Sequence, residues 1–172
     1  MKLTEDTVCE KNLYKGKVIE LYLQKVRLSN GKCSDREIVK HPGGVAIIAF
    51  KDKETILMVE QYRKPLERVL IELPAGKIEL GERTEECGKR ELEEETGYKA
   101  REFTYLGKIA TSPGFCNEYI YFYKAEDLYK GKLDRDEDEF INIKEVKIND
   151  IKEMIIKGII IDAKTISAFM YL

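Results

Sequence analysis

The sequence predicts a mixed α/β (α+β) protein: an α/β/α sandwich around a mixed sheet, preceded by an antiparallel three-stranded subdomain. Residues 44–50 read GVAIIAF, a nearly unbroken apolar run that is typical of a strand covered on both faces. Residues 84–97 begin at a threonine and end at a glycine, which are common first and last signals of a helix. Nearer the N-terminus, apolar and polar residues alternate around tight turns, as they do in half-exposed antiparallel strands.

The N-terminal subdomain is expected to contain three strands, at residues 7–14, 17–28 and 34–40. Lys15-Gly16 supplies the first turn and Asn30-Gly31 the second. Three strands with one apolar face need a further surface to cover that face. The subdomain is therefore expected to pack either on the rest of the chain or on a second subunit.

A domain boundary is expected at residues 41–44, which read HPGG. The two predicted domains are the antiparallel β subdomain at 1–41 and the main domain at 42–172. In the main domain, strands are expected at residues 45–50, 55–61, 69–73, 103–110, 118–125 and 140–148.

Three helices are expected in the main domain. Thr84 should cap the N-terminus of the first, and Gly97 should end it in the left-handed conformation. Asn149 should cap a short helix that ends near Gly158. Asp162 should cap a last helix at 163–171.

Composition argues against several classes of protein. The chain has 172 residues, enough to bury a proper core. Its net charge is −2 with 36% charged residues of both signs, so no basic field is expected to hold a nucleic acid. No signal peptide and no membrane span are expected, because no apolar run approaches about 18 residues. Four scattered cysteines and one histidine argue against a zinc site and favour free thiols in the cytoplasm.

The first predicted helix carries an unusual concentration of acidic residues. Glu91 lies one turn from both Glu94 and Glu95, so the three carboxylates share a face. Each like-charged pair costs about 0.2–0.5 kcal/mol, and acids in the last turn also oppose the helix dipole. A hard divalent cation, Mg²⁺ or Mn²⁺, would compensate for this repulsion. The alternative is a solvated acidic face, which is the usual meaning of a glutamate run.

Residues 76–98, GKIELGERTEECGKRELEEETGY, follow the pattern G-x5-E-x7-R-E-U-x-E-E-x-G-U, in which U is bulky and apolar. The chain therefore resembles the Nudix hydrolases, which cleave a nucleoside diphosphate linked to another group. The resemblance implies the α/β/α fold of that family and Mg²⁺ (or Mn²⁺) as cofactor. The matching positions are Gly76, Glu82, Arg90, Glu91, Leu92, Glu94, Glu95, Gly97 and Tyr98, where an aliphatic residue is more usual than tyrosine.

The same resemblance implies a metal site on this helix. Glu91 and Glu95 would be metal ligands, and Glu94 would join them or act as a catalytic residue beside them. The backbone carbonyl of Ala75 would be a further ligand.

Other residues of the pattern would act on these ligands. The resemblance implies that Arg90 fixes the carboxylates through a bidentate pair, with Glu82 as a candidate partner. The alternative for Arg90 and Glu82 is a purely structural salt bridge. Gly76 and Gly97 would serve the backbone conformation.

Outside this stretch, the chain resembles Nudix enzymes that act on ADP-ribose. Pro113 stands sixteen residues after Gly97, inside SPGFCNE, as a proline does in those enzymes. They also share REIVKHPGGVAII at 36–48, EQYR at 60–63 and ELPAG at 72–76. In that subfamily, N-terminal subdomains are exchanged within a homodimer and both chains line the nucleotide site.

The resemblance also implies which residues contact the substrate. They are Tyr14, Arg36, Glu37, Tyr62, Arg63, Pro113 and Gly114. The two arginines would hold the diphosphate or ribose, and one of the two tyrosines would stack on adenine. For each tyrosine the alternative is ordinary packing or surface exposure.

An acidic run, DRDEDE at 134–139, precedes the last predicted strand. Such a run is usually a solvated loop. Relatives in the subfamily use a loop at this place to supply a glutamate as catalytic base or extra metal ligand. Glu139 matches that glutamate best and Glu137 next. His41, the sole histidine, lies in the HPGG turn and is expected to be structural.

The sequence leaves three functions open. The first is hydrolysis of ADP-ribose, a small-molecule nucleoside diphosphate sugar, to AMP and ribose 5-phosphate by a cytoplasmic homodimer. The second is the same chemistry on GDP-mannose or another nucleotide sugar. The third is a non-catalytic nucleotide sensor with the Nudix fold, against which the complete set of carboxylates argues.

Overall fold

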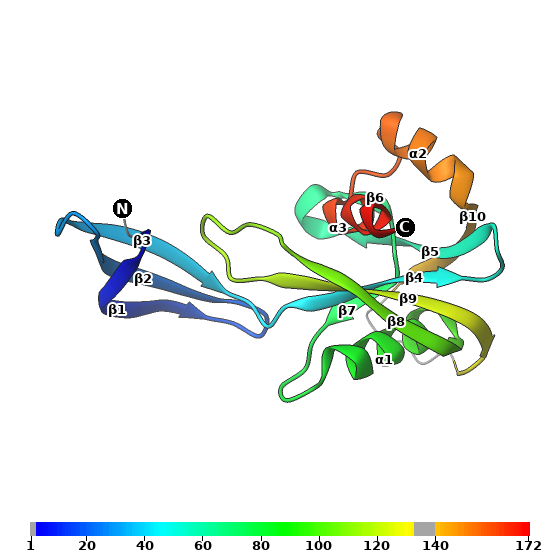
Figure 1. The fold of residues 1–172 in the computed structure, drawn as a ribbon, viewed down its shortest axis with the longest axis horizontal. Coiled ribbons are helices and arrows are strands. Elements are labelled where there is room, and N and C mark those ends of the chain that lie inside the picture. Colours follow the sequence, from blue (N-terminus) through cyan, green and yellow to red (C-terminus); the bar gives the residue numbers. More distant parts are fainter. Residues whose placement is uncertain (1–2, 133–139) are drawn as a thin grey trace. The chain divides into compact units, whose positions relative to one another are not determined.

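The computed structural model describes residues 3–132 and 140–172. The chain divides into two compact units, each with its own sheet (Figure 1). The first unit comprises Met1–Gly43 and Ala110–Tyr119, and the second comprises Gly44–Ile109 and Ile120–Leu172.

The first unit contains a three-stranded antiparallel sheet in the order β1-β2-β3. Its strands are β1 (Glu5–Lys15), β2 (Glu20–Leu28) and β3 (Cys33–Lys40). The antiparallel N-terminal sheet predicted from the alternating pattern is therefore present. Gly31 adopts a φ of 81° in the second turn, a conformation that glycine permits without strain.

The segment that contains Pro113 belongs to this first unit. Cys116 forms a parallel bridge with Val39 of β3. The Val39 N–H donates to the Phe115 carbonyl at 2.7 Å, and the Asn117 N–H donates to the Val39 carbonyl at 3.2 Å. Backbone pairing with β3 thus fixes the loop that follows Ala110.

The second unit is built on a seven-stranded sheet with a central path β10-β5-β4-β9-β8, to which β6 adds beside β5 and β7 beside β4. The β4–β9 pair is parallel and the β4–β5 pair antiparallel, so the sheet is mixed as predicted. The strands are β4 (Gly44–Phe50), β5 (Thr55–Arg63), β6 (Arg68–Glu72), β7 (Ala75–Lys77), β8 (Tyr98–Ala110), β9 (Tyr119–Lys130) and β10 (Ile141–Lys147).

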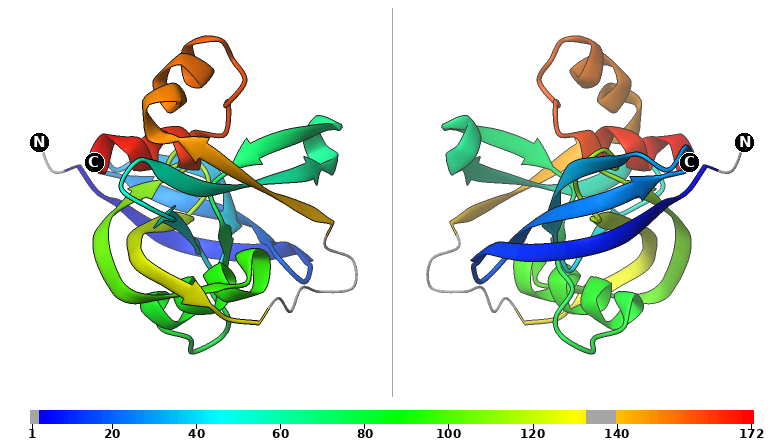
Figure 2. Two further views of the ribbon diagram at one scale, coloured as in Figure 1. Left: turned by 90° about the vertical axis from the view of Figure 1, so that its right-hand side faces the viewer. Right: turned by 90° about the vertical axis from the view of Figure 1, so that its left-hand side faces the viewer.

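Helices cover both faces of this sheet (Figures 1 and 2). On one face, α1 (Thr84–Thr96) packs Cys87 and Leu92 against Val45 and Ile47 of β4. On the other, α2 (Ile148–Ile156) and α3 (Ala163–Ala168) pack against alternate residues of the same strand. The apolar run GVAIIAF is therefore buried on both faces, which confirms the predicted sandwich.

Some predicted helix ends are confirmed. Gly97 ends α1 with a φ of 71°, and its N–H donates to the Glu93 carbonyl. Asp162 caps α3 by accepting from the Thr165 N–H at 3.0 Å. The α-helix stops at Ala168, and the 3₁₀ turn Phe169–Tyr171 continues it.

Two predicted caps are wrong. The cap of α1 is Arg83, and the hydroxyl of Thr84 lies 2.6 Å from that of Tyr123 instead. The cap of α2 is Lys147, so Asn149 lies inside the helix. Two short elements were not predicted, the strand β7 and the 3₁₀ turn Lys64–Leu66. Across the described ranges, no helix is both long and apolar enough to cross a membrane.

Candidate active site

The acidic helix lies beside a short strand that carries the expected backbone ligand. Strand β7 pairs with β4, with Ala75 opposite Ala46 and Gly76 opposite Val45. A Cβ added at Gly76 would lie 1.9 Å from the Glu91 carboxylate. Glycine at this position therefore allows the Glu91 carboxylate to lie directly over the backbone.

Arg90 gathers three carboxylates around one guanidinium. Its Nε donates to Glu82 Oε1 at 2.9 Å and its Nη2 to Glu82 Oε2 at 3.0 Å. Its Nη1 donates to Glu91 at 2.7 Å and to Glu94 at 2.9 Å. Arg90 thus forms the bidentate pair with Glu82 that the sequence suggested, and it also offsets the repulsion between Glu91 and Glu94.

Glu95 takes a different position from its two neighbours. Its side chain is buried, with only 3% of the residue exposed, and Oε2 accepts from the Ala75 N–H at 2.9 Å. Glu91 is also largely covered, with 12% of its side chain exposed. The crowded face of α1 is therefore not a solvated acidic surface, which was the alternative reading of the glutamate run.

The ion pair with Arg90 changes the titration of its partner. The hydrogen bonds from Arg90 lower the pKa of Glu82 to about 2. In return, the carboxylates raise the pKa of Arg90 above its ordinary value. Burial raises the pKa of the Cys87 thiol, whose Sγ lies 3.3 Å from the Lys77 carbonyl. That cysteine is therefore a packed thiol, not a nucleophile.

The donor set suits a hard divalent cation. Glu91, Glu94 and Glu95 of α1 supply carboxylate oxygens next to β7. Within the ranges that the structure describes, no three acidic, His or Cys side chains already converge as a ligand set. Arg90 holds Glu91 and Glu94 in the arrangement seen here. A metal ion would therefore share these carboxylates with the guanidinium.

A buried ion cluster lies beside this region in the same unit. Glu72, only 1% exposed, accepts from Arg63 Nε at 2.8 Å and Nη2 at 2.7 Å, and it also contacts the Lys164 ammonium. Burial would raise the pKa of Glu72, but Arg63 and Lys164 together lower it. Arg63, expected to contact substrate, thus has a carboxylate partner that sequence reasoning missed, although a buried acid in ELPAG required one.

The expected substrate residues of the first unit lie on its sheet. Arg36 makes a bidentate pair with Glu5, with contacts of 3.0 and 2.6 Å. Glu37 is exposed on β3. Tyr14 is 56% exposed on β1. In the second unit, Tyr62 is likewise 52% exposed at the end of β5. Neither tyrosine is part of a packed core.

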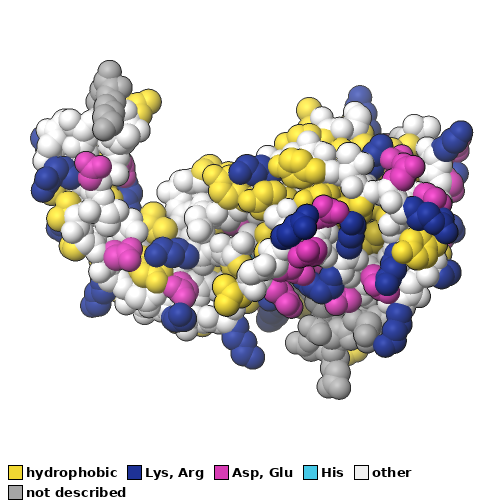
Figure 3. Space-filling view, turned by 60° about the horizontal axis from the view of Figure 1, so that its bottom comes forward, with side chains coloured by type: hydrophobic (Ala, Val, Ile, Leu, Met, Phe, Trp, Pro, Cys, Tyr) yellow, Lys and Arg dark blue, Asp and Glu magenta, His cyan; other side chains and the backbone are white. Residues whose placement is uncertain are grey.

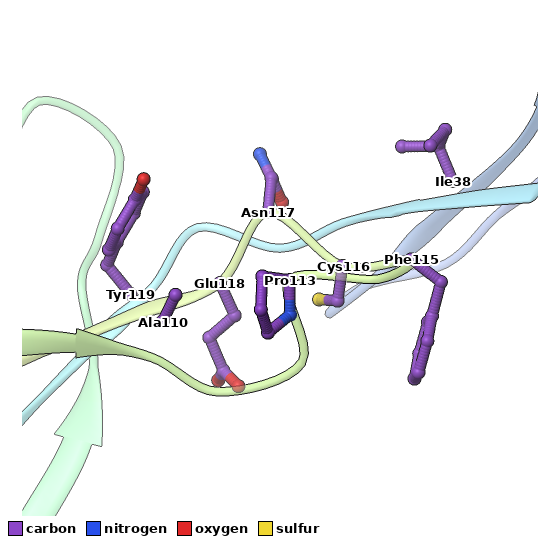
Figure 4. A pocket seen from close by; sticks show the side chains of 8 residues that line it. All are labelled: Ile38, Ala110, Pro113, Phe115, Cys116, Asn117, Glu118 and Tyr119. Atoms are coloured by element: carbon purple, nitrogen blue, oxygen red, sulfur yellow. The ribbon is translucent and has the colours of Figure 1, made fainter. Parts of the chain in front are cut away.

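A pocket of about 300 Å³ lies in the first unit around Pro113 (Figure 4). The predicted residue Gly114 is not part of its lining, and a Cβ added there would meet only open space. The lining residues are Ile38, Ala110, Pro113, Phe115, Cys116, Asn117, Glu118 and Tyr119. His41 is held next to this pocket by Asn117, whose Oδ1 accepts from the His41 backbone N–H at 2.7 Å. The His41 Nδ1 accepts from the Gly43 N–H at 3.0 Å.

Glu137 and Glu139, the two candidates for a catalytic base, lie outside the described residues.

On the side of the molecule where α1 lies, acidic and basic side chains are interspersed over the surface (Figure 3). No field of one sign dominates that view, in agreement with the net charge of −2.

The chain is similar to known proteins over most of its length. A family model described as "NUDIX domain" matches residues 40–169. An ADP-ribose pyrophosphatase of Bacillus subtilis (strain 168) is 48% identical over 172 residues, which cover 99% of this chain and 93% of that protein. A methanol dehydrogenase activator of Bacillus methanolicus is 45% identical over 170 residues, 98% of this chain and 92% of that protein. A crystal structure of an ADP compounds hydrolase aligns with a TM-score of 0.88 at 20% identity, covering 99% of this chain and 94% of that one, and so has the same fold.

The close approach at Gly76 generates a first prediction. Gly76→Ala is expected to keep the fold, because the added methyl group meets only the far end of the Glu91 side chain, which can rotate away. Displacing that carboxylate should weaken Mn²⁺ binding by about tenfold or more. Titration with Mn²⁺ followed by electron paramagnetic resonance measures the affinity, and thermal unfolding checks the fold. Gly114→Ala is the control, since its Cβ has open space. Equal Mn²⁺ affinity in both variants would contradict the assignment of Glu91.

The Arg90–Glu82 pair generates a prediction on pH. Because the pKa of Glu82 is depressed to about 2, its stabilising effect is complete above pH 4.5 and is lost as the pH falls through 2. Wild type should exceed Glu82→Gln in free energy of unfolding by about 1 kcal/mol at pH 6, after allowance for solvent screening. The difference should vanish near pH 2. Urea unfolding at a series of pH values measures it, and a difference independent of pH would refute the pairing.

Proposed function

The chain belongs to the NUDIX domain family, and we propose that it hydrolyses the diphosphate of ADP-ribose to AMP and ribose 5-phosphate. One observation carries the proposal: Arg90 holds Glu82, Glu91 and Glu94 beside the strand on which Glu95 meets Ala75. The similarity of nearly the whole chain to an ADP-ribose pyrophosphatase supports the choice of substrate.

Within this proposal, Glu91, Glu95 and the Ala75 carbonyl would hold Mg²⁺ or Mn²⁺, with Glu94 beside them. Such an ion supplies charge neutralisation at the phosphate oxygens and an activated water. Arg90 keeps the carboxylates oriented through its four contacts with them. Glu139 or Glu137 would accept the proton of the attacking water.

The remaining substrate contacts are proposed on the two units separately. Arg63 and Arg36 would bind the diphosphate or ribose, each exchanging part of its present carboxylate pairing for phosphate oxygens. Tyr14 and Tyr62 are exposed aromatic rings suited to stacking on adenine. The pocket around Pro113 offers a further apolar surface for the substrate.

We also propose that the protein is a homodimer in which the N-terminal subdomain, residues 1–41, is exchanged between subunits. Every residue of β1 is exposed, and Val8 and Leu13 each expose 48% of their surface. An eleven-residue edge strand with exposed apolar side chains is a surface on which another chain can pair and pack. A cytoplasmic location is part of the same proposal, since all four cysteines are free thiols.

Three other functions are alternatives to this proposal. GDP-mannose or another nucleotide sugar is the alternative substrate, and a sensor that binds without cleaving is the alternative class. A third candidate is activation of an alcohol dehydrogenase, favoured by the 45% identity to a methanol dehydrogenase activator. Adding the protein to a methanol dehydrogenase assay tests that candidate directly.

Turnover should be highest with ADP-ribose. We expect its kcat/KM to exceed that of GDP-mannose and of diadenosine polyphosphates by about tenfold or more. Glu95→Gln should lower hydrolysis by about a hundredfold or more while the fold survives, because the amide oxygen can still accept from Ala75 but carries no charge. Glu86→Gln on the exposed side of α1 is the matched control and should retain activity. Full activity of Glu95→Gln, or preference for another substrate, would overturn the assignment.

The dimer has its own test. Sedimentation should give twice the 19.9 kDa of one chain. Val8→Lys should shift the protein toward monomer, because a charge would be buried at the interface. Ile156→Lys, a change at a 75% exposed residue of α2, should leave the mass unchanged. A monomeric wild type would refute the proposal.

A further inference from the structure

The four residues that lead into Gly76 have a hydrogen-bond partner at each step. The Glu72 carboxylate pairs with Arg63 and Lys164. The Leu73 N–H donates to Thr165 Oγ1 at 2.9 Å. The Pro74 carbonyl accepts from the Ile47 N–H at 2.9 Å, and the Ala75 N–H donates to Glu95 at 2.9 Å. These contacts fix the path of the backbone up to Ala75, whose carbonyl is proposed as a metal ligand.

Two of the contacts come from α3, which lies far away in the sequence. Thr165 is fully buried, and its hydroxyl accepts from Leu73 while donating to Asp162 Oδ2 at 2.6 Å. Asp162 also accepts from the Thr165 N–H at 3.0 Å and pairs with Lys164 at 3.0 Å. The hydroxyl therefore donates its proton to Asp162 and accepts the Leu73 N–H with a lone pair, so its orientation is fixed.

We propose that Thr165 is a positioning residue for the active site: by holding the Leu73 amide, it sets the place of Ala75 and Gly76 relative to Glu91 and Glu95. The inference rests on the proposed function. Leu73 is fully buried, so its N–H has no access to water if the hydroxyl is removed. A buried amide without an acceptor makes the backbone shift toward another partner. A shift at Leu73 moves Ala75, two residues further on.

The chain offers a matched pair of threonines for the test. Thr55 is also buried, follows an aspartate by three residues, and donates its N–H to that aspartate at 2.8 Å, as Thr165 does to Asp162. Its side chain likewise bonds to Asp52. Thr55 begins β5, and across the described residues its hydroxyl accepts no backbone N–H, unlike the hydroxyl of Thr165. Thr55→Val therefore reproduces the loss of a buried hydroxyl without touching the segment before Gly76.

The variants are Thr165→Val, Thr165→Ser and Thr55→Val, all assayed in the full-length protein. Thr165→Val is expected to raise the Kd for Mn²⁺ about tenfold, the effect typical of losing a group that orients a metal ligand. Activity should fall at limiting Mn²⁺ and recover at saturating Mn²⁺, with the KM for ADP-ribose unchanged there. Thr165→Ser keeps the hydroxyl and should restore the wild-type Kd. Thr55→Val should lower thermal stability only.

A measurement on the wild type covers the case in which Thr165→Val does not fold. Mn²⁺ should slow hydrogen exchange of the Leu73 amide, while the Thr55 amide should exchange at the same rate with and without the metal. Equal Mn²⁺ affinity in wild type and Thr165→Val, or a Leu73 amide insensitive to Mn²⁺, would overturn the inference while leaving the proposed function intact. A wild type that neither binds Mn²⁺ nor cleaves ADP-ribose would overturn both.

Discussion

The guanidinium of Arg90 is the contact on which the site depends. Its N–H groups donate to the carboxylates of Glu82, Glu91 and Glu94, at distances between 2.7 and 3.0 Å. Without it, a largely covered face of α1 would hold uncompensated like charges one turn apart. The arginine therefore allows a short helix to carry several carboxylates at a place where a cation could bind them. Arg90 contacts both carboxylate oxygens of Glu82, and it contacts Glu91 through Oε1 and Glu94 through Oε2.

The second requirement is a rigid backbone opposite those acids. Strand β7 is only three residues long, and its order comes from outside itself. It pairs with β4 through Ala75 and Gly76, and Glu95 of α1 also holds Ala75. The two residues before the strand are held by α3 at Leu73 and by β4 at Pro74. The site is thus formed by α1 and β7, and contacts with the rest of the second unit fix the distance between them. In the proposed arrangement, α3 has a role beyond covering the sheet, because Thr165 holds the Leu73 N–H.

Some features governed by short-range rules were predicted correctly from the sequence, and others were not. Gly97 and Asp162 end and begin their helices because local geometry demands a left-handed residue and a side-chain acceptor. Thr84 and Asn149 are residue types that often cap helices, but neither caps one here. The Thr84 hydroxyl lies against that of Tyr123 instead. At the start of α2, the Ile148 N–H donates to the Glu54 carbonyl. Contacts between distant residues had no sequence signal: nothing in ELPAG or in the last helix indicates that Leu73 and Thr165 meet across 92 positions.

That separation has a consequence for how the protein is made. The segment around Leu73 emerges during translation well before α3 has been synthesised, 92 residues later. Until then the acceptor for the Leu73 amide does not exist, and neither does the ammonium of Lys164 that neutralises Glu72. A nascent chain therefore carries the acidic helix before the contacts of α3 with Leu73 and Glu72 can form.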